Sequence, residues 1–357
     1  MREYTINSNT YKSLRFLRKN FVFFSLLFVS FGFLLQHIGL IIPDKYLNAP
    51  ENDWNVVGIM ESWLHVSYFE FGFIRRAAIG TILAPFSKEI SRVLYFFISV
   101  FCLLLLIYVF RRIVKNDKLS KKLSCIMILS PAFFLNVGWN FGRFDFVNFA
   151  ILYFALVNAK RRNYLASSLL SSLAICIHEA FLFYGIPLIA ASIVKYADGK
   201  PTRRFIKFAF LPVFVSIYLF LYGSSTDVNA LAANRPLIQY QSFDWLNYSV
   251  SIYYVLFSSL MYIKLIKRRL DILSISPFLT FVLFILGVDY MRWVTLFLIS
   301  CFMSIVIRDD LSDKLDGSIG FFTIALILPL PLGPLGVVKP FPAFEDFLML
   351  IEKVGLG

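Results

Sequence analysis

The sequence predicts an all-α protein, a polytopic bundle of about eleven transmembrane helices that forms a single integral membrane domain over residues 1–357. Its composition is 59% hydrophobic and 18% aromatic, whereas a soluble domain is roughly half apolar. Long apolar runs recur along the chain, and Lys and Arg gather in alternate connecting segments, as in membrane proteins. We therefore expect lipid to solvate much of the chain.

The apolar runs place the elements in chain order. The first run, 21–42, is too long for the apolar core of a signal peptide and lacks a small-residue cleavage site, so it predicts a first membrane span. Several later runs hold only 13–15 residues, a helical rise of about 20 Å against a hydrocarbon core of roughly 30 Å. We expect the polar turns between them to lie below the outer surface, in a water-filled cavity. The predicted spans are 21–42, 93–110, 123–137, 146–158, 164–177, 180–194, 208–222, 249–263, 272–288, 294–307 and 318–338.

The positive charges set the orientation. Of the 35 Lys and Arg residues, 25 fall in alternate segments that we expect to be cytoplasmic: 1–20, 111–122, 159–163, 195–207, 264–271 and 308–317. This pattern predicts a multi-pass protein of the bacterial inner membrane, with a cytoplasmic basic N-terminus and a periplasmic C-terminus. It also accounts for the net charge of +13, and no basic groove or motif indicates a nucleic-acid partner.

Two longer segments, 43–92 and 223–248, are expected to be outer loops because they are poor in positive charge. The first loop contains an apolar stretch at 72–86 that carries Arg75 and Arg76. A membrane span at this stretch would invert the topology of everything after it and break the charge pattern. We therefore expect a re-entrant or interfacial helix at 72–86.

Ionisable residues gather at the polar turns that the topology places on the outer side. Such residues are costly at membrane depth, and they commonly pair, face a cavity and serve a function. We expect them to line one pocket open to the outer leaflet, although nothing local in the chain forces them together. The candidates are Arg75, Arg76, Arg143, Asp145, His178, Glu179, Asp289 and Arg292.

These residue types suit glycosyl transfer from a lipid-linked donor. Arginine forks match phosphate oxygens. The residues assigned to phosphate and sugar binding are therefore Arg75, Arg76, Arg143 and Arg292, together with Asp289, the acidic neighbour of Arg292. A carboxylate or imidazole accepts the proton of an attacking hydroxyl. Glu179 is the predicted general base, with His178 as its orienter or an alternative base, and Asp145 is a further catalytic candidate.

Each group also has a structural interpretation. Arg75 and Arg76 would serve as an interfacial anchor, and Arg143 with Asp145 as a salt bridge that closes a turn. Asp289 and Arg292 stand three residues apart, the spacing of an ion pair on one helical turn. HExxH and CxxC spacings are absent from the sequence, so no metal ligand and no cofactor is assigned, and a divalent metal remains an open alternative.

With these residues in view, the chain resembles the bacterial O-antigen polymerases of the Wzy type, which build lipopolysaccharide and related surface polysaccharides. The resemblance is carried by GFIRR at 72–76, FGRFD at 141–145, IHEAFLF at 177–183 and VDYMRW at 288–293. It implies block transfer of polyprenyl-pyrophosphate-linked repeat units at the periplasmic face. The implied partners are the polyprenyl-linked glycan, membrane lipid and other polysaccharide-assembly proteins. The chain departs from the pattern at loop 223–248, which is short and has one basic residue, Arg235.

Two alternatives remain open. GT-C-type glycosyltransferases use a polyprenyl-phosphate sugar and a carboxylate in the first outer loop, and loop 43–92 with Asp53 is similar to that arrangement. A transporter or flippase for lipid-linked glycans is the other alternative, although transporters more often carry such groups near the midplane.

Overall fold

The structure, a computed structural model, is described for part of the chain. The described residues are 67–71, 77–86, 92–116, 144–196, 201–222, 245–266, 270–286 and 290–308, with the single positions 123, 124, 127, 128 and 133. Within them every regular element is a helix, which confirms the all-α class. The predicted spans 21–42 and 318–338, most of the predicted span 123–137, the N-terminal segment 1–20 and most of segment 223–248 lie outside the described residues.

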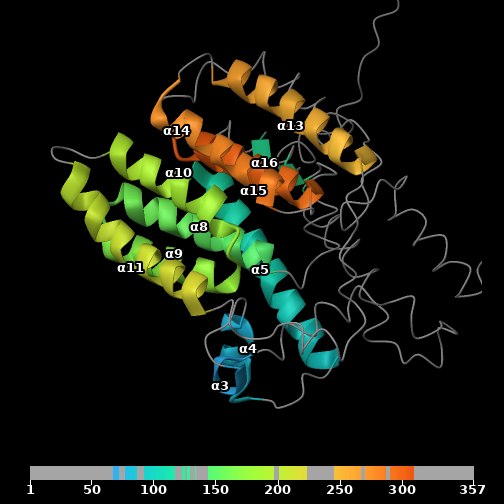
Figure 1. Cartoon of the computed structure of the whole chain (residues 1–357), viewed down its shortest axis with the longest axis vertical. Helices are drawn as coiled ribbons and strands as arrows, with labels where there is room; N and C mark the ends of the chain where they lie inside the picture. The colour runs from blue at the N-terminus through green and yellow to red at the C-terminus, as the bar shows by residue number, and fades with distance from the viewer. Residues whose placement is uncertain are drawn as a thin grey trace, which may run out of the picture.

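Helices occupy eight of the predicted spans (Figure 1). Within the predicted helix at 72–86, residues 78–83 form the short helix α4, residues 72–76 lie outside the described part, and the short helix α3 precedes them. The helices are α3 (Tyr68–Phe71), α4 (Ala78–Leu83), α5 (Arg92–Asn116), α8 (Asp145–Lys160), α9 (Tyr164–Ile177), α10 (Phe181–Lys195), α11 (Pro201–Tyr222), α13 (Trp245–Leu265), α14 (Ile272–Ile275), the 3-10 helix η3 (Ser276–Phe281), α15 (Val282–Leu286) and α16 (Tyr290–Val306).

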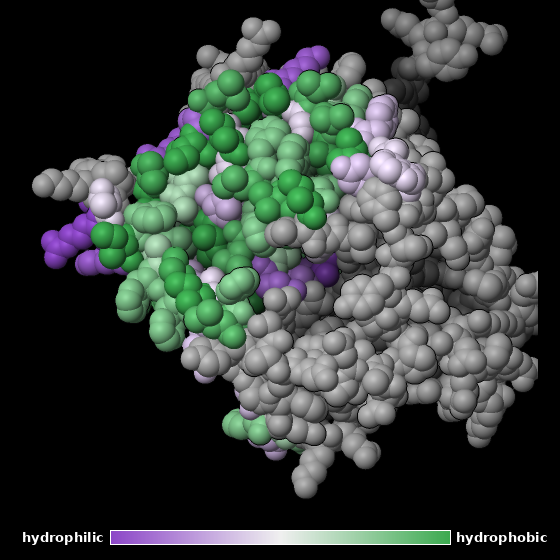
Figure 2. All heavy atoms as spheres, viewed as in Figure 1, coloured by the Kyte–Doolittle hydropathy of each residue, from purple (hydrophilic) through white to green (hydrophobic). Residues whose placement is uncertain are grey.

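One described segment is long and apolar enough to cross a membrane by length and composition, namely Thr202–Leu221 of α11, and 17% of its most apolar window is buried. Five further apolar stretches of described helix are shorter, with 10–17 residues each. The described structure thus contains helices where the sequence predicts spans, but it does not establish eleven of them. Figure 2 shows apolar side chains covering much of the described face, with hydrophilic residues gathered at its left and upper edges.

Helices α8 and α16 run parallel and in register along the centre of the bundle. Arg292 contacts Asp145 at the start of both helices, and the Lys160 ammonium donates to the Ile307 carbonyl at 3.1 Å at their ends. Both contacts join residues 147 positions apart in the chain. Fifteen residues of helix separate the two contacts, which corresponds to about 22 Å.

Packed phenylalanine rings join α5, α8 and α16. Phe110, Phe149 and Phe302 come from these three helices, and Phe133 contributes a fourth ring. Ring centroids lie 5.3–6.4 Å apart, within the range of favourable aromatic contacts. All four side chains are buried, so this cluster holds the first described long helix against the central pair.

Four buried serines let α9 pack closely against its neighbours. They stand at i, i+1, i+4 and i+5, and their small side chains allow close approach of helix backbones. The Ser168 hydroxyl donates to the Phe208 carbonyl of α11 at 2.7 Å. Ser171 and Ser172 donate instead to carbonyls four residues earlier in α9. The serines are Ser167, Ser168, Ser171 and Ser172.

Gly185 makes room for a buried ring on α10. A β-carbon added there would lie 2.5 Å from the ring of Phe181, which is buried and packed against Tyr184. We expect Gly185→Ala to lower the free energy of unfolding by about 1–2 kcal/mol, because overpacking outweighs the gain in helix propensity. Thermal unfolding in detergent measures the change. In a Phe181→Leu background the same substitution should become neutral or stabilising, and an unchanged penalty there would contradict this explanation.

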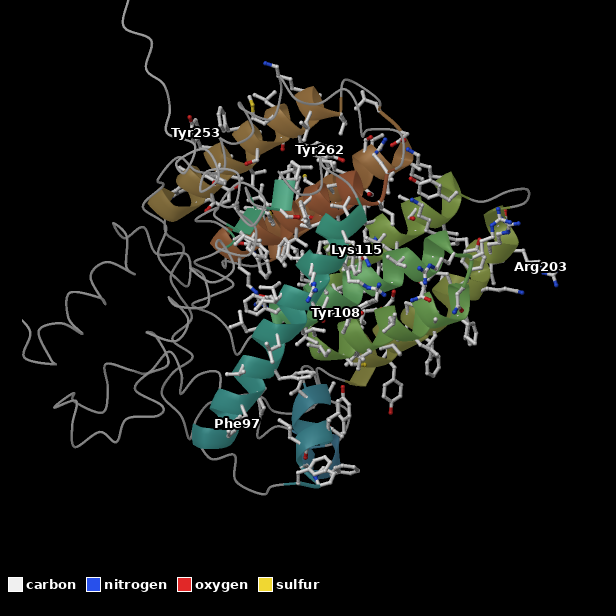
Figure 3. All side chains as sticks on the ribbon, turned by 180° about the vertical axis from the view of Figure 1, so that it is seen from behind. Phe97, Tyr108, Lys115, Arg203, Tyr253 and Tyr262 are labelled. Carbon is white, nitrogen blue, oxygen red and sulfur yellow. The ribbon has the colours of Figure 1, made fainter. Side chains whose placement is uncertain are left out.

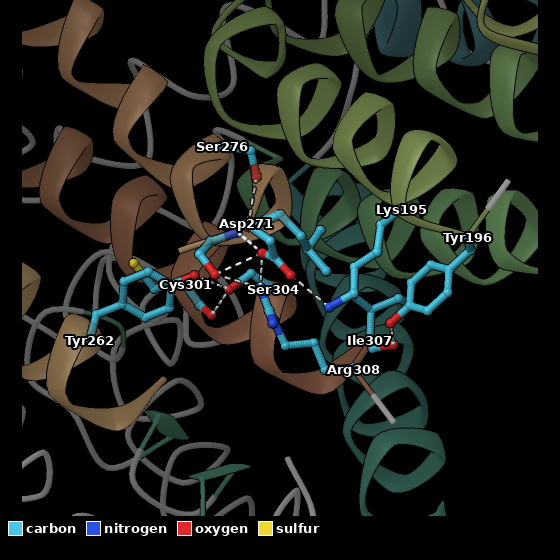
Figure 4. Close-up of polar contacts among 11 residues, drawn as sticks. Lys195, Tyr196, Tyr262, Asp271, Ser276, Cys301, Ser304, Ile307 and Arg308 are labelled. Carbon is cyan, nitrogen blue, oxygen red and sulfur yellow. Dashed lines mark hydrogen bonds and ion pairs between the residues drawn. The ribbon is translucent and has the colours of Figure 1, made fainter. Parts of the chain in front are cut away.

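A polar cluster closes one end of the bundle around Asp271, the residue that caps α14 (Figure 4). Lys195 donates to the Asp271 carboxylate at 2.8 Å, Arg308 also binds this carboxylate, and the backbone N–H of Ser274 donates to it at 2.8 Å. The Arg308 side chain is fully buried. We call this end of the bundle the basic end; it contains Lys160, Lys195, Arg203 and Arg308.

Asp271 should stabilise the fold only in its ionised form. Burial raises its pKa, but hydrogen bonds from Lys195, Arg308 and Ser274 outweigh burial and hold the pKa well below its usual range. Because the folded-state pKa is lowered, this stabilisation is present above about pH 4 and is lost as pH falls through the folded-state value. Asp271→Asn should cost about 1–3 kcal/mol at pH 7. Unfolding of both proteins should converge in strong acid, and a constant difference from pH 7 downward would contradict the prediction.

Candidate functional site

The opposite end of the bundle is held by a buried ion pair between α8 and α16. The Nε and Nη2 atoms of Arg292 donate to the two carboxylate oxygens of Asp145 at 2.7 and 2.8 Å. Arg292 is 3% exposed and Asp145 is 7% exposed. The guanidinium also lies 5.8 Å from the ring centre of Trp293, close enough for a cation–π contact. This geometry is the fork-to-fork pairing that gives arginine–carboxylate contacts their strength and direction.

The pairing differs from the one expected from the sequence. Asp145 was predicted to accompany Arg143, and Arg292 to accompany Asp289, because each pair is adjacent in the chain. In the structure both oxygens of Asp145 accept from Arg292. The sequence did not predict this partner, which Asp145 meets because parallel α8 and α16 bring the two helix starts together; Arg143 and Asp289, the other members of the predicted pairs, lie outside the described residues.

The backbone before Asp145 is in an unusual conformation. Phe144 precedes α8 with φ of 57° and ψ of 17°, a left-handed geometry that costs a residue with a β-carbon about 1–2 kcal/mol. Its ring is buried, which holds the turn in place. Asp145 thereby occupies the first position of α8, where the positive end of the helix dipole favours a carboxylate.

The α9–α10 turn lies at the same end of the bundle. The Asn148 side-chain amide donates to the Ala174 carbonyl at 3.3 Å. Because α8 and α9 are antiparallel, this contact places Asp145 at the level of Ile177, next to His178. We call this the site end; it contains Asp145, His178, Glu179 and Arg292.

His178 shapes the turn that joins α9 to α10. Its backbone is extended, and its Nδ1 atom accepts the N–H of Ala180 at 3.1 Å. The Nδ1 atom stands 3.7 Å from the Glu179 carboxylate, beyond a hydrogen bond. The accepting Nδ1 indicates the tautomer that carries its hydrogen on Nε2. His178 is buried, and its hydrogen bond with the Ala180 N–H ties the side chain to the backbone of the turn.

Glu179 is the more accessible of the two described carboxylates at the site end. Its side chain is 30% exposed, whereas that of Asp145 is 9% exposed. Its backbone carbonyl accepts a hydrogen bond from the Leu182 N–H in the first turn of α10. This bond holds the Glu179 backbone, from which the side chain extends, in place. Among the predicted catalytic residues, Glu179 therefore has the geometry best suited to meet a substrate.

No protein-family model, curated protein or solved structure matches this chain. The resemblance to O-antigen polymerases accordingly remains an expectation carried by the quoted residues.

Four predicted site residues, Arg75, Arg76, Arg143 and Asp289, lie outside the described residues. Part of the predicted first outer loop, 43–92, is described. The Tyr68 hydroxyl of α3 lies beside the Cys176 thiol, two residues before His178. The backbone N–H of Tyr68 also donates to the Thr81 hydroxyl at 2.7 Å, which joins α3 to α4. Part of the first loop therefore reaches the site end.

Three further residues shape the site end without having been predicted. Asn148 links α8 to α9, Tyr184 is buried close to Asp145 and Arg292, and Trp293 lies against the guanidinium. Asn148 stands one helical turn after Asp145, and this spacing was the available sequence signal for it. Among the described residues, no group of three or more His, Cys, Asp or Glu side chains is arranged to hold a metal ion.

Proposed function

We propose that this protein is a multi-pass membrane glycosyltransferase that acts on polyprenyl-linked sugars at its site end. Among such enzymes we favour a polymerase of O-antigen or capsule repeat units at the periplasmic face of a bacterial inner membrane. The observation that carries the proposal is the convergence, from distant parts of the chain, of the buried Asp145–Arg292 pair and the partly exposed Glu179.

The exposed apolar surface supports a membrane location. Phe210, Phe214 and Phe220 of α11 are 59–75% exposed, and α5 and α13 present exposed aromatic and aliphatic residues as well. Water is a poor solvent for such a surface, and lipid is a good one. The Asp145–Arg292 ion pair and the hydrogen bond from Lys160 to the Ile307 carbonyl mark the two ends of the α8–α16 pair, about 22 Å apart. This separation is less than the hydrocarbon thickness, which supports a site end sunk below the outer surface.

The proposed reaction joins two sugars. An acceptor hydroxyl attacks the anomeric carbon of the donor, and the bond from that carbon to the pyrophosphate oxygen breaks. The polyprenyl pyrophosphate leaves with the bonding electron pair, and Glu179 takes the hydroxyl proton as general base. His178 holds the turn that presents Glu179. The fork of Arg292 is largely occupied by Asp145, so we assign this pair to holding the site and leave phosphate binding to Arg75, Arg76 and Arg143.

One observation favours a GT-C-type enzyme as the second candidate. Tyr68 brings part of the first outer loop to Cys176 at the site end, and that loop holds Asp53, a candidate carboxylate. The two candidates differ in their product. A strain lacking the gene should carry a single complete repeat on its lipid carrier if the protein is a polymerase, and a truncated repeat if it adds one sugar. A complete repeat confined to the cytoplasmic face would instead indicate a flippase.

Reporter fusions test the membrane arrangement. We expect fusions after Val114 and Ala197 to report a cytoplasmic location, and fusions after Asn55 and Gln239 a periplasmic one, because positive charge concentrates in the segments assigned to the cytoplasm. A fusion near Lys88 should report the periplasm. A cytoplasmic signal there would make the stretch around 72–86 a true span and invert the map beyond it.

A further inference from the structure

Basic side chains dominate one end of the four consecutive helices α8 to α11. The described acidic residues of these helices are Asp145 and Glu179, and both lie at the site end. The linker 197–200 adds one acid and one base, Asp198 and Lys200. The basic end carries seven cations from these helices and their turns: Lys160, Arg161, Arg162, Lys195, Arg203, Arg204 and Lys207.

Two helices begin side by side at this end. The Ser168 hydroxyl bonds the Phe208 carbonyl, and α9 and α11 are parallel because the single antiparallel helix α10 connects them. Four residues before this contact lie Tyr164, the first residue of α9, and Arg204 in the first turn of α11, so the two residues lie at the same level. Arg161 and Arg203 are exposed there, and Arg203 points away from the helices (Figure 3).

A single exposed stripe of α11 combines charge with apolar surface. Its members are spaced three or four residues apart, which places them on one face of the helix. The stripe begins with exposed Arg203 and Lys207 and continues with apolar side chains that are 54–74% exposed. The apolar members are Phe210, Phe214, Ile217 and Leu221.

The charges at the start of α11 are unfavourable within the protein itself. Arg203 and Arg204 lie in its first turn, which contains no acidic residue. The positive end of the helix dipole repels cations by about 0.3–1 kcal/mol each. An anion bound at this end would offset both the dipole and the mutual repulsion of the basic side chains.

We propose that the exposed stripe of α11, with Arg161 beside it, binds an anionic phospholipid. The phosphate meets Arg203 and Lys207, and the acyl chains lie along Phe210, Phe214 and Ile217. Charge complementarity identifies this occupant, because a zwitterionic lipid would not offset the excess of basic residues. The inference rests on the proposed membrane location but not on the glycosyl-transfer chemistry.

The test is lipid competition on the full-length protein in a neutral detergent. Phosphatidylglycerol and phosphatidylcholine are titrated together, and the lipid retained by the protein is counted by native mass spectrometry. The wild type should prefer phosphatidylglycerol. Arg203→Gln/Lys207→Gln should weaken phosphatidylglycerol binding by roughly 30-fold, since each cation near an anionic headgroup contributes about 1 kcal/mol.

A matched control is available on α5. Arg111 and Lys115 are also exposed and four residues apart, and Arg111→Gln/Lys115→Gln should change binding less than threefold. Arg203→Lys/Lys207→Arg keeps the charge and should retain the preference. If the double Gln variant does not fold, Lys207→Gln alone should weaken binding about fivefold.

Three outcomes would overturn the proposal: no preference for phosphatidylglycerol in the wild type, equal losses from the α5 and α11 pairs, or displacement of the lipid by inorganic phosphate at matched ionic strength. The last would identify a site for free phosphate. A protein that stays soluble without detergent would refute the membrane location as well. A detergent-dependent protein without lipid preference would refute only this inference.

Discussion

Glu179→Gln should abolish long-chain polysaccharide while the protein inserts at normal levels. The substitution keeps the shape of the side chain and removes the proton acceptor, and loss of a general base typically costs about 10²- to 10⁴-fold in rate. Glu179 is the more accessible of the two described carboxylates at the site end, with its side chain 30% exposed. The measurement is a gel of surface polysaccharide from a strain that lacks the native gene and expresses the variant.

Three companion variants separate chemistry from architecture. Glu179→Asp keeps the carboxylate and should retain part of the ladder. His178→Asn keeps a side-chain acceptor for the Ala180 N–H, so it should retain more activity than His178→Ala if His178 only orients the turn. A full ladder of long chains from Glu179→Gln would remove Glu179 from the mechanism, whatever the companions show.

Breaking the Asp145–Arg292 pair should give the largest loss of stability among the described contacts. Asp145→Ala and Arg292→Ala each remove one partner of a buried ion pair, which typically costs about 3–5 kcal/mol. Arg292→Lys keeps the charge but loses the fork that contacts both oxygens of Asp145. We expect it to fall between the wild type and Arg292→Ala. Thermal unfolding in detergent, followed by tryptophan fluorescence, measures each change.

A double-mutant cycle tests whether the two residues act as one unit. Asp145→Asn/Arg292→Gln removes both charges and keeps polar side chains. Its cost should be smaller than the summed costs of Asp145→Asn and Arg292→Gln by about 2 kcal/mol or more. Additive costs would refute the pairing. If the stable double variant also makes polymer, the pair only holds the site. If it is stable but inactive, one of the two side chains also contributes to the chemistry.

Helix α9 illustrates how local sequence sets an element. The prediction of 164–177 matches its bounds, because polar residues flank an apolar run on both sides. Asn163 caps its start by accepting the Ala166 N–H at 3.3 Å, and His178 leaves the helix at the other end. Helix α11 was predicted from residue 208 but begins at Pro201. The hydropathy pattern marks only the apolar stretch of this helix, whereas Pro201 and the basic residues that follow it are helical as well.

The sequence alone determined the helical class, the run of short apolar helices and the separation of basic from acidic residues, because these follow from composition and spacing along the chain. Only the tertiary structure showed that Asp145 binds Arg292, 147 positions away. The sequence predicted its neighbour Arg143, which lies outside the described residues, and it did not predict Arg292, which reaches Asp145 because α8 and α16 run parallel with their first turns at the same level. Such a contact depends on which helices lie side by side, and no local pattern around Asp145 contains that information.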